Sequence, residues 1–513
     1  MKVTLAGFNI DKNLIDKLPE GTIATPETIS AAYARISRDP RDVPELRTEA
    51  REQVKKARRS NKAIVFGMSH HSVAEHAYFN FDILQISRLA LEELEARRIG
   101  AAYTEKSQRY ITLQGDYVIP KEFKEEDAKK FCKLVEFQND FYLQNLQKLT
   151  DHQFASNPEL AEQAQHAIEK GTSEKMNRAK NTLEGWAKED ARYALSLATQ
   201  AQLGLSFNAR TLEHAIRTMR HSNLTECREL SQKLFDVTKD VAPSLIILTD
   251  PDEFKKAFKT ELQDDNFKFT RSNLKKYISL IIKEYYGELS EDLPEILEEE
   301  YEKLIISNNI DQNIATAIIH YNSKLPVEDA FRLASIILLD ENGGKEFFEE
   351  ALKYISAFDS IPREFEISGD LKFELVVSAS NFAQLKRHRL MTLLAQDYDP
   401  TLGITIPASI KAIEAENSFN DVCRRSEKLY NEFLPKYGKA AEYCLTNAHR
   451  RRVLIAANPR ELYHFSRLRE DEHAQWDIKE TAGRMMKLAK KAAPLSFMLS
   501  GGKDKFEELK KEV

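Results

Sequence analysis

The stretch "NPRELYH", residues 458–464, decides the fold, because the chain holds a near copy of it, "NARTLEH", at residues 208–214. The two copies share Asn, Arg, Leu and His at the same positions. They start 250 residues apart (458 minus 208), which is about half of the 513-residue chain. Each copy begins a predicted helix and is followed by arginine-rich sequence. A repeat of this kind predicts a duplicated domain.

The boundary between the two copies is expected in the charged stretch at residues 250–268, which begins with Asp-Pro-Asp-Glu. Few contacts cross polar, proline-containing sequence, so domain boundaries often fall there. A chain of this length also exceeds the size at which a single core keeps growing. We therefore expect an N-terminal domain over 1–250 and a C-terminal domain over 268–513.

The predicted fold class is α+β and rich in helix, with a small sheet packed against long helices in each domain. Only 17 Gly and 16 Pro are present to interrupt helices. Apolar residues recur at helical spacing in many windows, for example from Ile83 to Leu94. Three short apolar runs, at 62–66, 117–120 and 373–377, are expected to be strands.

The composition argues against several classes of protein. A net charge of -6 disfavours a chain that coats nucleic acid, because such binding depends on basic surfaces. The four cysteines lack the spacing of a disulfide framework or a zinc site. No window approaches the roughly 20 apolar residues that cross a bilayer. We expect a soluble, cytoplasmic protein without nucleic-acid or membrane partners.

Two segments carry complementary halves of a binding pattern. Arg387, His388 and Arg389 place three nitrogen-rich side chains in one turn, which suits an anionic ligand. The polar residues that should complete such a site do not follow them. The earlier segment 105–109 has that polar end, because Arg can fork onto a phosphate and Ser can donate to it. Its residues are Glu105, Lys106, Ser107, Gln108 and Arg109.

The repeated stretch itself has two interpretations. Asn458, followed by Pro459 and then Glu461, is a good helix start, and capping alone explains the Asn. Arg460 and His464 are four residues apart and would share one helix face, and Arg469 and His473 form a second such pair. These pairs predict either a ligand-facing stripe or a solvated basic face.

Taken together, these motifs resemble a tandem form of the flavin-dependent thymidylate synthase family. Its signature is R-H-R-x-x-S-x-N-x-x-S-x-R, with an H-x-S/T-x-x-E-H stretch upstream, which "HHSVAEH" at 70–76 matches. The second half keeps the R-H-R head but has Thr392 and Leu394 for the Ser and Asn. The first half has Ala96-Arg97-Arg98 in place of the head and keeps the tail.

The resemblance implies a methyltransferase of nucleotide biosynthesis that converts dUMP to dTMP, with methylenetetrahydrofolate as carbon source and FAD reduced by NADPH. Arg469 would be catalytic, by promoting ionisation of the uracil. The implied FAD ligands are His70, Ser72, Glu75, Arg387, His388, Arg389, Asn458, Arg460, His464 and His473. The implied dUMP ligands are Gln384, Glu105, Lys106, Ser107, Gln108, Arg109, Arg192 and Arg469.

The losses in the two halves are complementary. The family has an Arg sixteen residues before the Asn of the repeated stretch; the first half has Arg192 there and the second half has Glu442. Because the family builds each site from several subunits, we expect one composite site from the head of the second half and the tail of the first. The family is typically a homotetramer, so a homodimer of tandem chains is expected.

Two other functions remain open. His70, His71, Glu75 and His76 could bind a metal in a hydrolase, but their spacing fits neither H-E-x-x-H nor H-x-x-E-H, and we expect no metal. The replacements at Thr392, Leu394 and Glu442 also fit a divergent nucleotide- or flavin-binding homologue that is inactive or acts on another pyrimidine.

Overall fold

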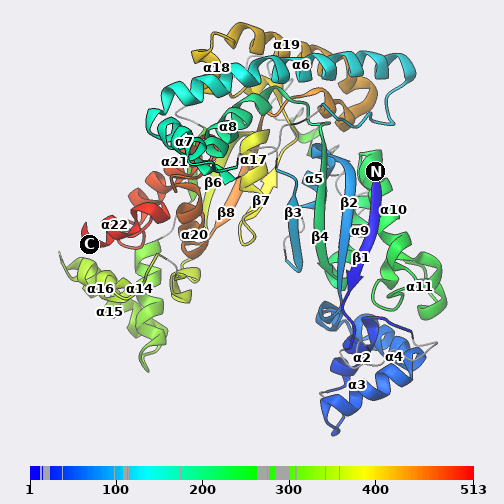
Figure 1. The fold of residues 1–513 in the computed structure, drawn as a ribbon. Coiled ribbons are helices and arrows are strands. Elements are labelled where there is room, and N and C mark those ends of the chain that lie inside the picture. Colours follow the sequence, from blue (N-terminus) through cyan, green and yellow to red (C-terminus); the bar gives the residue numbers. More distant parts are fainter. Residues whose placement is uncertain are drawn as a thin grey trace. The chain divides into compact units, whose positions relative to one another are not determined.

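The protein consists of two compact units in a computed structural model (Figure 1). The first unit contains residues 1–293 and 408–446, and the second contains 294–407 and 447–513. The structure describes the chain apart from residues 12–13, 15–22, 37–38, 97–98, 108–112, 114, 174–175, 263–273, 275–276, 279, 283–300, 307–308, 341, 358 and 513.

The first unit is built on a four-stranded antiparallel sheet with the order β1-β2-β4-β3. Along the second strand Phe79, Phe81 and Ile83 are buried and alternate with exposed residues, because successive side chains of a strand point to opposite faces. The strands are β1 (Lys2–Phe8), β2 (Tyr78–Ser87), β3 (Ala101–Glu105) and β4 (Gln200–Asn208).

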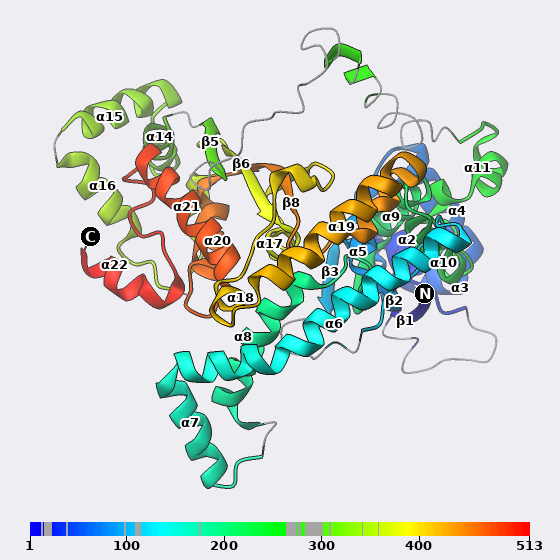
Figure 2. The ribbon, with the colours of Figure 1, turned by 90° about the horizontal axis from the view of Figure 1, so that it is seen from above.

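Helices surround this sheet, and in Figure 2 the long helices α6 and α19 run side by side. The 32 residues of α6 contain neither Gly nor Pro, and Phe131, Val135, Tyr142 and Leu149 form its buried stripe. The helices are α2 (Glu27–Arg35), α3 (Val43–Glu52), α4 (Val54–Asn61), α5 (Arg88–Leu94), α6 (Glu125–Ser156), α7 (Pro158–Glu169), α8 (Arg178–Ala191), α9 (Ala209–Arg220), α10 (Thr225–Thr238), α11 (Pro251–Phe258), α18 (Ala408–Ala412) and α19 (Glu416–Tyr437).

The segment 408–446 packs within the first unit although it follows three strands of the second sheet in the sequence. Gln138 of α6 donates to Ser426 Oγ at 2.8 Å and to the Cys444 carbonyl at 3.0 Å. Ser196 forms an isolated bridge with Thr446, its counterpart 250 residues later. The contacts thus group this segment with residues 1–293, whereas the boundary at 250–268 remains a proposal about the ancestry of the chain.

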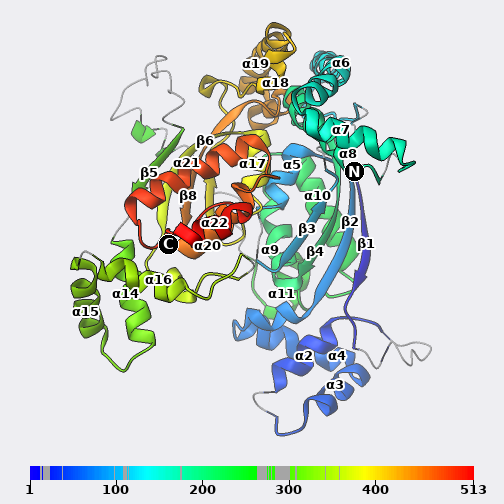
Figure 3. The ribbon, with the colours of Figure 1, turned by 60° about the vertical axis from the view of Figure 1, so that its left-hand side comes forward.

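The second unit repeats the same sheet, with the order β5-β6-β8-β7 and antiparallel pairing throughout. In Figure 3, α20 and α21 lie against this sheet. Phe365, Phe373, Ile455 and Phe497 are among its fully buried core residues. The elements are β5 (Glu302–Ile306), α14 (Ile310–Tyr321), α15 (Val327–Leu339), α16 (Gly343–Leu352), η7 (Arg363–Glu366), β6 (Leu371–Ser378), α17 (Ala379–Leu385), β7 (Thr392–Ala395), β8 (Arg450–Ala457), α20 (Pro459–Arg469), α21 (Trp476–Ala492) and α22 (Phe506–Glu512).

Corresponding helices of the two units begin in the same way. Asn208 caps α9 by accepting from the Thr211 N–H at 2.8 Å, and Asn458 caps α20 by accepting from the Glu461 N–H at 2.9 Å. The expectation that both copies of the repeated stretch begin a helix is therefore confirmed, and so is the helix-rich α+β class.

A second pair of caps also recurs. Ser87 caps α5 and donates its hydroxyl to the buried Glu226 at 2.5 Å, whereas Ser378 caps α17 and donates to the buried Asp477 at 2.6 Å. The two carboxyl groups come from α10 and α21, which follow α9 and α20 in the chain. Equal strand order and equal caps support the duplication.

Some local expectations were wrong. Residues 62–66 form the π-helical turn η1 (Lys62–Gly67), because α4 runs directly into them without a turn residue between. Residues 117–120 form only an isolated bridge, Tyr117 to Thr199. Ile83 and Ile86 belong to β2 rather than to a helix, since α5 begins at Arg88. The strand expected at 373–377 is confirmed within β6. Within the described ranges, no helix has the length and apolar character needed to cross a membrane.

Candidate functional site

The turn after α17 presents the R-H-R segment of the second unit. Ser378 starts α17, all of whose residues are buried, and the chain leaves the helix after Leu385. The Arg387 and Arg389 side chains are exposed, whereas His388 is only 2% exposed and its ring meets the Phe465 ring at 4.8 Å. Two guanidinium groups therefore flank one buried imidazole.

Arg469, the last residue of α20, is held by this segment. Its Nε donates to His388 Nε2 at 3.0 Å, and its two terminal nitrogens donate to the side chain and backbone oxygens of Gln384 at 3.2 and 3.3 Å. Gln384 in turn donates to Gln475 Oε1 at 3.2 Å. The structure thus brings together three residues singled out from the sequence: Gln384, His388 and Arg469.

The protonation of His388 follows from this geometry. Arginine has no acceptor atom, so the nitrogen that binds Arg469 must carry a lone pair. Nε2 is therefore unprotonated, and in the neutral ring the proton lies on Nδ1. His388 Nδ1 lies 3.8 Å from Oε1 of Glu461.

Glu461 is the residue of this cluster that the sequence interpretation missed. It is 4% exposed, and burial raises its pKa to about 7, against the opposing effects of the Leu390 N–H and the charge of Arg460. From the sequence it was assigned only to the cap of α20. One feature of the sequence could have indicated that Glu461 is buried: it lies four residues before the apolar Phe465, on the same face of the helix.

The remaining residues of the predicted stripe have separate surroundings. His464 lies with its ring 6.0 Å from that of His388, and desolvation together with Arg467 and Arg469 lowers its pKa. Arg460 donates to the Ile361 carbonyl at 2.7 Å and forms an ion pair with Glu366 of η7.

The expected helical pairing of Arg469 with His473 is wrong. Helix α20 ends at Arg469, so the two side chains do not share a helix face. His473 lies in the following turn with its side chain 85% exposed, and its backbone N–H donates to Asp471 Oδ1 at 3.0 Å. The acidic sequence after Arg469 favours this turn because Asp side chains bind backbone N–H groups locally.

In the first unit, the upstream segment lies on a short 3₁₀ helix, η2 (His71–His76), with His70 just before it and Ser72 within it. Glu75 Oε1 accepts from Arg210 of α9 at 2.6 Å, and both side chains are partly exposed. The ion pair of Arg460 with Glu366 recurs at the same place in the second unit. An Arg near the start of α9 or α20 thus anchors a helical turn before the second strand.

The segment 105–109, which matches the polar tail of the family signature, begins at the end of β3. Glu105 ends the strand opposite Leu203, the Lys106 N–H donates to the Gln202 carbonyl at 2.9 Å, and Ser107 comes next. Gln108 and Arg109 lie outside the described residues.

The sheet register aligns this tail with its counterpart. In the second unit, Ala395 lies opposite Val453, which is 250 residues after Leu203. Glu105 therefore corresponds to Ala395, and two residues later Ser107 corresponds to Asp397. The second copy has a carboxylate where the first has a hydroxyl.

Arg192 and Glu442 are a second corresponding pair that differs in charge, here with opposite signs. Arg192 begins the 3₁₀ turn η4 (Arg192–Ala194) and is 5% exposed. Glu442, 250 residues later, is 1% exposed in η9 (Gly438–Cys444). A buried guanidinium in one copy is thus replaced by a buried carboxyl group in the other.

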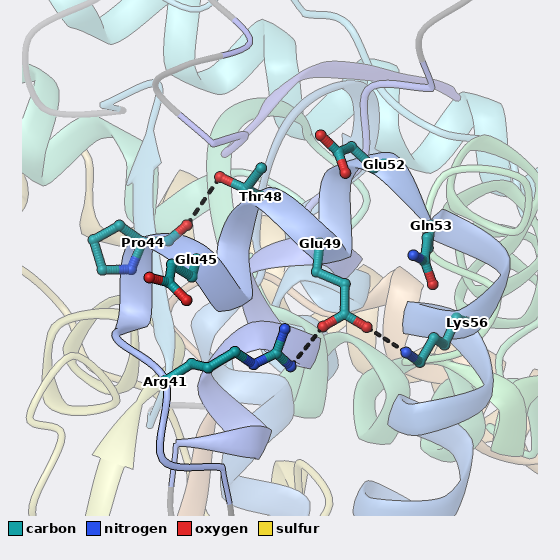
Figure 4. A pocket seen from close by; sticks show the side chains of 8 residues that line it. All are labelled: Arg41, Pro44, Glu45, Thr48, Glu49, Glu52, Gln53 and Lys56. Atoms are coloured by element: carbon teal, nitrogen blue, oxygen red, sulfur yellow. Dashed lines mark hydrogen bonds and ion pairs between the residues drawn. The ribbon is translucent and has the colours of Figure 1, made fainter.

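Two further features bear on other kinds of site. Among the residues with described positions, no group of three or more His, Cys, Asp or Glu side chains could hold a metal ion. A shallow pocket on α3 and α4 is lined by residues that include Arg41, Glu49 and Lys56 (Figure 4). Glu49 forms ion pairs with both basic residues there. None of the residues singled out from the sequence lines this pocket.

Comparison with known proteins gives matches in both halves. The family model described as thymidylate synthase complementing protein matches residues 15–244 and 303–495. A UPF0159 protein of Thermoplasma acidophilum is 23% identical over 82% of this chain and 84% of the relative. The flavin-dependent thymidylate synthase of Clostridium tetani is 31% identical over 44% of this chain and 83% of the relative.

A further relative, the flavin-dependent thymidylate synthase of Helicobacter pylori strain J99, is 33% identical over 33% of this chain and 70% of the relative. The enzymes so named match less than half of this chain, whereas the UPF0159 protein matches most of it, as expected for a tandem form. The resemblance inferred from the motifs is confirmed. The chain belongs to the thymidylate synthase complementing protein family.

Proposed function

We propose that the chain is a flavin-dependent thymidylate synthase, which forms dTMP from dUMP with methylenetetrahydrofolate and NADPH as co-substrates. The observation that carries this proposal is the fixed orientation of Arg469, with its guanidinium held by Gln384 and His388. A positive charge set against the uracil ring favours its anionic form and so makes the ring carbon more nucleophilic.

The rigidity of this arrangement matters for catalysis. Three hydrogen bonds set the plane of the Arg469 guanidinium before any ligand arrives, so little reorganisation is needed when charge develops on the pyrimidine. Gln384 is itself fixed by Gln475, which caps α21. Gln384 and Arg469 would hold the base, and neither role requires a cysteine nucleophile.

The phosphate of dUMP is assigned to the first copy, with Glu105, Lys106, Ser107, Gln108, Arg109 and Arg192 as the proposed ligands. The differences in charge between the two copies support this assignment. At the corresponding positions of the second copy, Asp397 adds a negative charge where Ser107 is neutral and Glu442 reverses the charge of Arg192, and both would repel a phosphate. One composite site would therefore combine the phosphate side of the first copy with the base side of the second, in a homodimer of tandem chains.

FAD is proposed for the R-H-R segment. The exposed Arg387 and Arg389 present guanidinium donors suited to the diphosphate of a dinucleotide. Among the described residues, these two side chains are the ones that match the chemistry of FAD most directly. The bound flavin would supply the hydride of the reaction. Further proposed ligands, kept from the family pattern, are His70, Ser72, Glu75, Asn458, Arg460, His464 and His473.

A divergent homologue with another substrate is a second candidate. The relatives that match nearly the whole chain carry the name UPF0159, which states no activity, and they are 22–23% identical. Thr392 also stands in β7 where the family signature has Ser. Binding of dUMP without formation of dTMP would favour this candidate.

The Arg387→Ala variant is expected to be purified without its flavin. Loss of the guanidinium removes a charged hydrogen-bonding partner, which typically contributes about 1.5–3 kcal/mol, or roughly ten- to hundredfold in affinity. The measurement is the visible absorption spectrum of the purified protein, recorded with and without dUMP. The matched control is Arg332→Ala, which removes an exposed Arg of α15 in the same unit. Equal flavin content in both variants would refute the proposal that the Arg387-His388-Arg389 segment binds FAD.

A further inference from the structure

His388 lies between two groups of opposite character. Its Nε2 accepts from Arg469 Nε at 3.0 Å, and its Nδ1 lies 3.8 Å from Glu461 Oε1. The imidazole is 2% exposed and the carboxyl group 4% exposed, so water screens their interaction little. The ring therefore donates no hydrogen bond to the carboxyl group at this distance but lies between it and the guanidinium of Arg469, to which it is hydrogen-bonded.

Glu461 is held in this position by the start of its helix. Its backbone N–H donates to the cap residue Asn458 at 2.9 Å, which fixes the first turn of α20. Moving a carboxyl group out of water is costly unless neighbouring groups compensate for the lost hydration. In a purely structural capping box the Glu side chain would turn back to the backbone N–H of the cap residue Asn458.

The first copy supplies an internal comparison. Thr211 occupies the third position after its cap residue Asn208, where the second copy has Glu461. Its hydroxyl donates to the backbone carbonyl of Ile99 at 2.7 Å. The same copy has Ala96-Arg97-Arg98, without a histidine, in place of the Arg387-His388-Arg389 head. The carboxyl group is thus present in the copy that has the histidine and absent from the other.

We infer that Glu461 is a positioning residue, which selects the tautomer of His388 and thereby orients Arg469 toward the pyrimidine. This inference rests on the proposed function for its catalytic consequence. A carboxyl group near Nδ1 favours the proton on that nitrogen and leaves the lone pair of Nε2 for Arg469. In the opposite tautomer, an N–H on Nε2 would face the Nε–H of Arg469, and the two donors would repel.

The test follows His388 directly by ¹⁵N NMR of the full chain labelled in histidine, with its signals assigned from the His388→Gln variant. In the wild-type protein we expect a protonated Nδ1 and an unprotonated Nε2. In Glu461→Leu we expect a mixture of tautomers, with kcat lowered about tenfold or more and KM for dUMP little changed. An unchanged tautomer in Glu461→Leu would overturn the inference.

The matched control is Glu302→Leu. Glu302 is 6% exposed, and burial raises its pKa to about 7, as for Glu461, but its partners are Arg484 at 2.6 Å and Thr481 at 3.1 Å. This variant is expected to lose stability while the His388 signals stay unchanged. A similar change in both variants would show that loss of packing, rather than the carboxyl group near Nδ1, alters His388.

A titration of the wild-type protein tests the inference should Glu461→Leu fail to fold. Arg460 acts on Glu461, Arg469 and His464 lie beside His388, and Arg467 and Arg469 act on His464. Ionisation of Glu461 should shift the Nδ1 signal in a step near pH 7, and the step should persist in His464→Gln. Absence of the step would overturn the inference. Because no substrate is needed, a chain that shows the step yet forms no dTMP would refute the proposed function alone.

Discussion

Replacing Arg469 by Ala is expected to lower kcat for dTMP formation by roughly 10²- to 10³-fold, the usual effect of losing one preorganised charge-stabilising donor. The reason is local. Three hydrogen bonds to Gln384 and His388 orient this guanidinium before a substrate binds. The measurement is the initial rate of dTMP formation at saturating dUMP, methylenetetrahydrofolate and NADPH.

The Arg469→Lys variant is the control for charge. A lysine keeps the positive charge but cannot form the three directed bonds, so we expect partial recovery of kcat relative to Ala. Binding of dUMP, followed through the change in the flavin spectrum, should persist in both variants because the phosphate is assigned to other residues. Full activity of Arg469→Ala would contradict the assigned catalytic role.

Substitution of Arg192 by Gln is expected to weaken dUMP binding by about ten- to hundredfold, because a charged hydrogen bond contributes about 1.5–3 kcal/mol. Arg192 is almost completely buried, so its loss is not compensated by solvent. The measurement is calorimetric titration with dUMP and, separately, with deoxyuridine. Only the nucleotide should bind more weakly, since deoxyuridine lacks the phosphate.

The duplication provides the control for Arg192. Glu442 occupies the same position in the other copy and is equally buried, so Glu442→Gln perturbs an equivalent place in the fold. It should leave dUMP binding unchanged. If the two variants weakened binding equally, or if Arg192→Gln weakened deoxyuridine as much as dUMP, Arg192 would not bind the phosphate.

Much of the fold could be predicted because local chemistry determines it. The Asn residues of the repeated stretches cap α9 and α20, as the sequence pattern indicates. The association of Gln384, His388 and Arg469 follows the family signature, and the structure places all three in one unit. These features depend on residues near in sequence or on a motif whose spacing is distinctive.

Other features depend on distant contacts that no sequence window contains. Residues 408–446 pack against α6 and neighbouring segments of the first unit, which the linear boundary could not indicate. The run at 62–66 continues a helix because nothing interrupts it, although a short apolar run also fits a strand. Glu461 was overlooked because capping of α20 already explained a Glu at this position. The sequence therefore offered no reason to assign it the proposed role of positioning His388.

The proposed composite site would account for the pattern of losses in the two copies. Two copies with the same strand order need not both keep every ligand once one site uses residues from each. With the proposed composite site, Ser107 and Arg192 of the first copy would serve the phosphate, and their counterparts Asp397 and Glu442 in the second copy would not be needed as ligands. Complementary decay of this kind is expected for a composite site and is not expected for two independent ones.

The release of tritium from dUMP labelled at ring carbon 5, measured together with dTMP formation, tests the central claim most directly. The purified chain would be supplied with FAD, NADPH and methylenetetrahydrofolate, with the Clostridium tetani relative as the positive control. The account predicts that this chain releases tritium and forms dTMP in equal amounts. Neither tritium release nor dTMP, under conditions in which the control forms both, would contradict it.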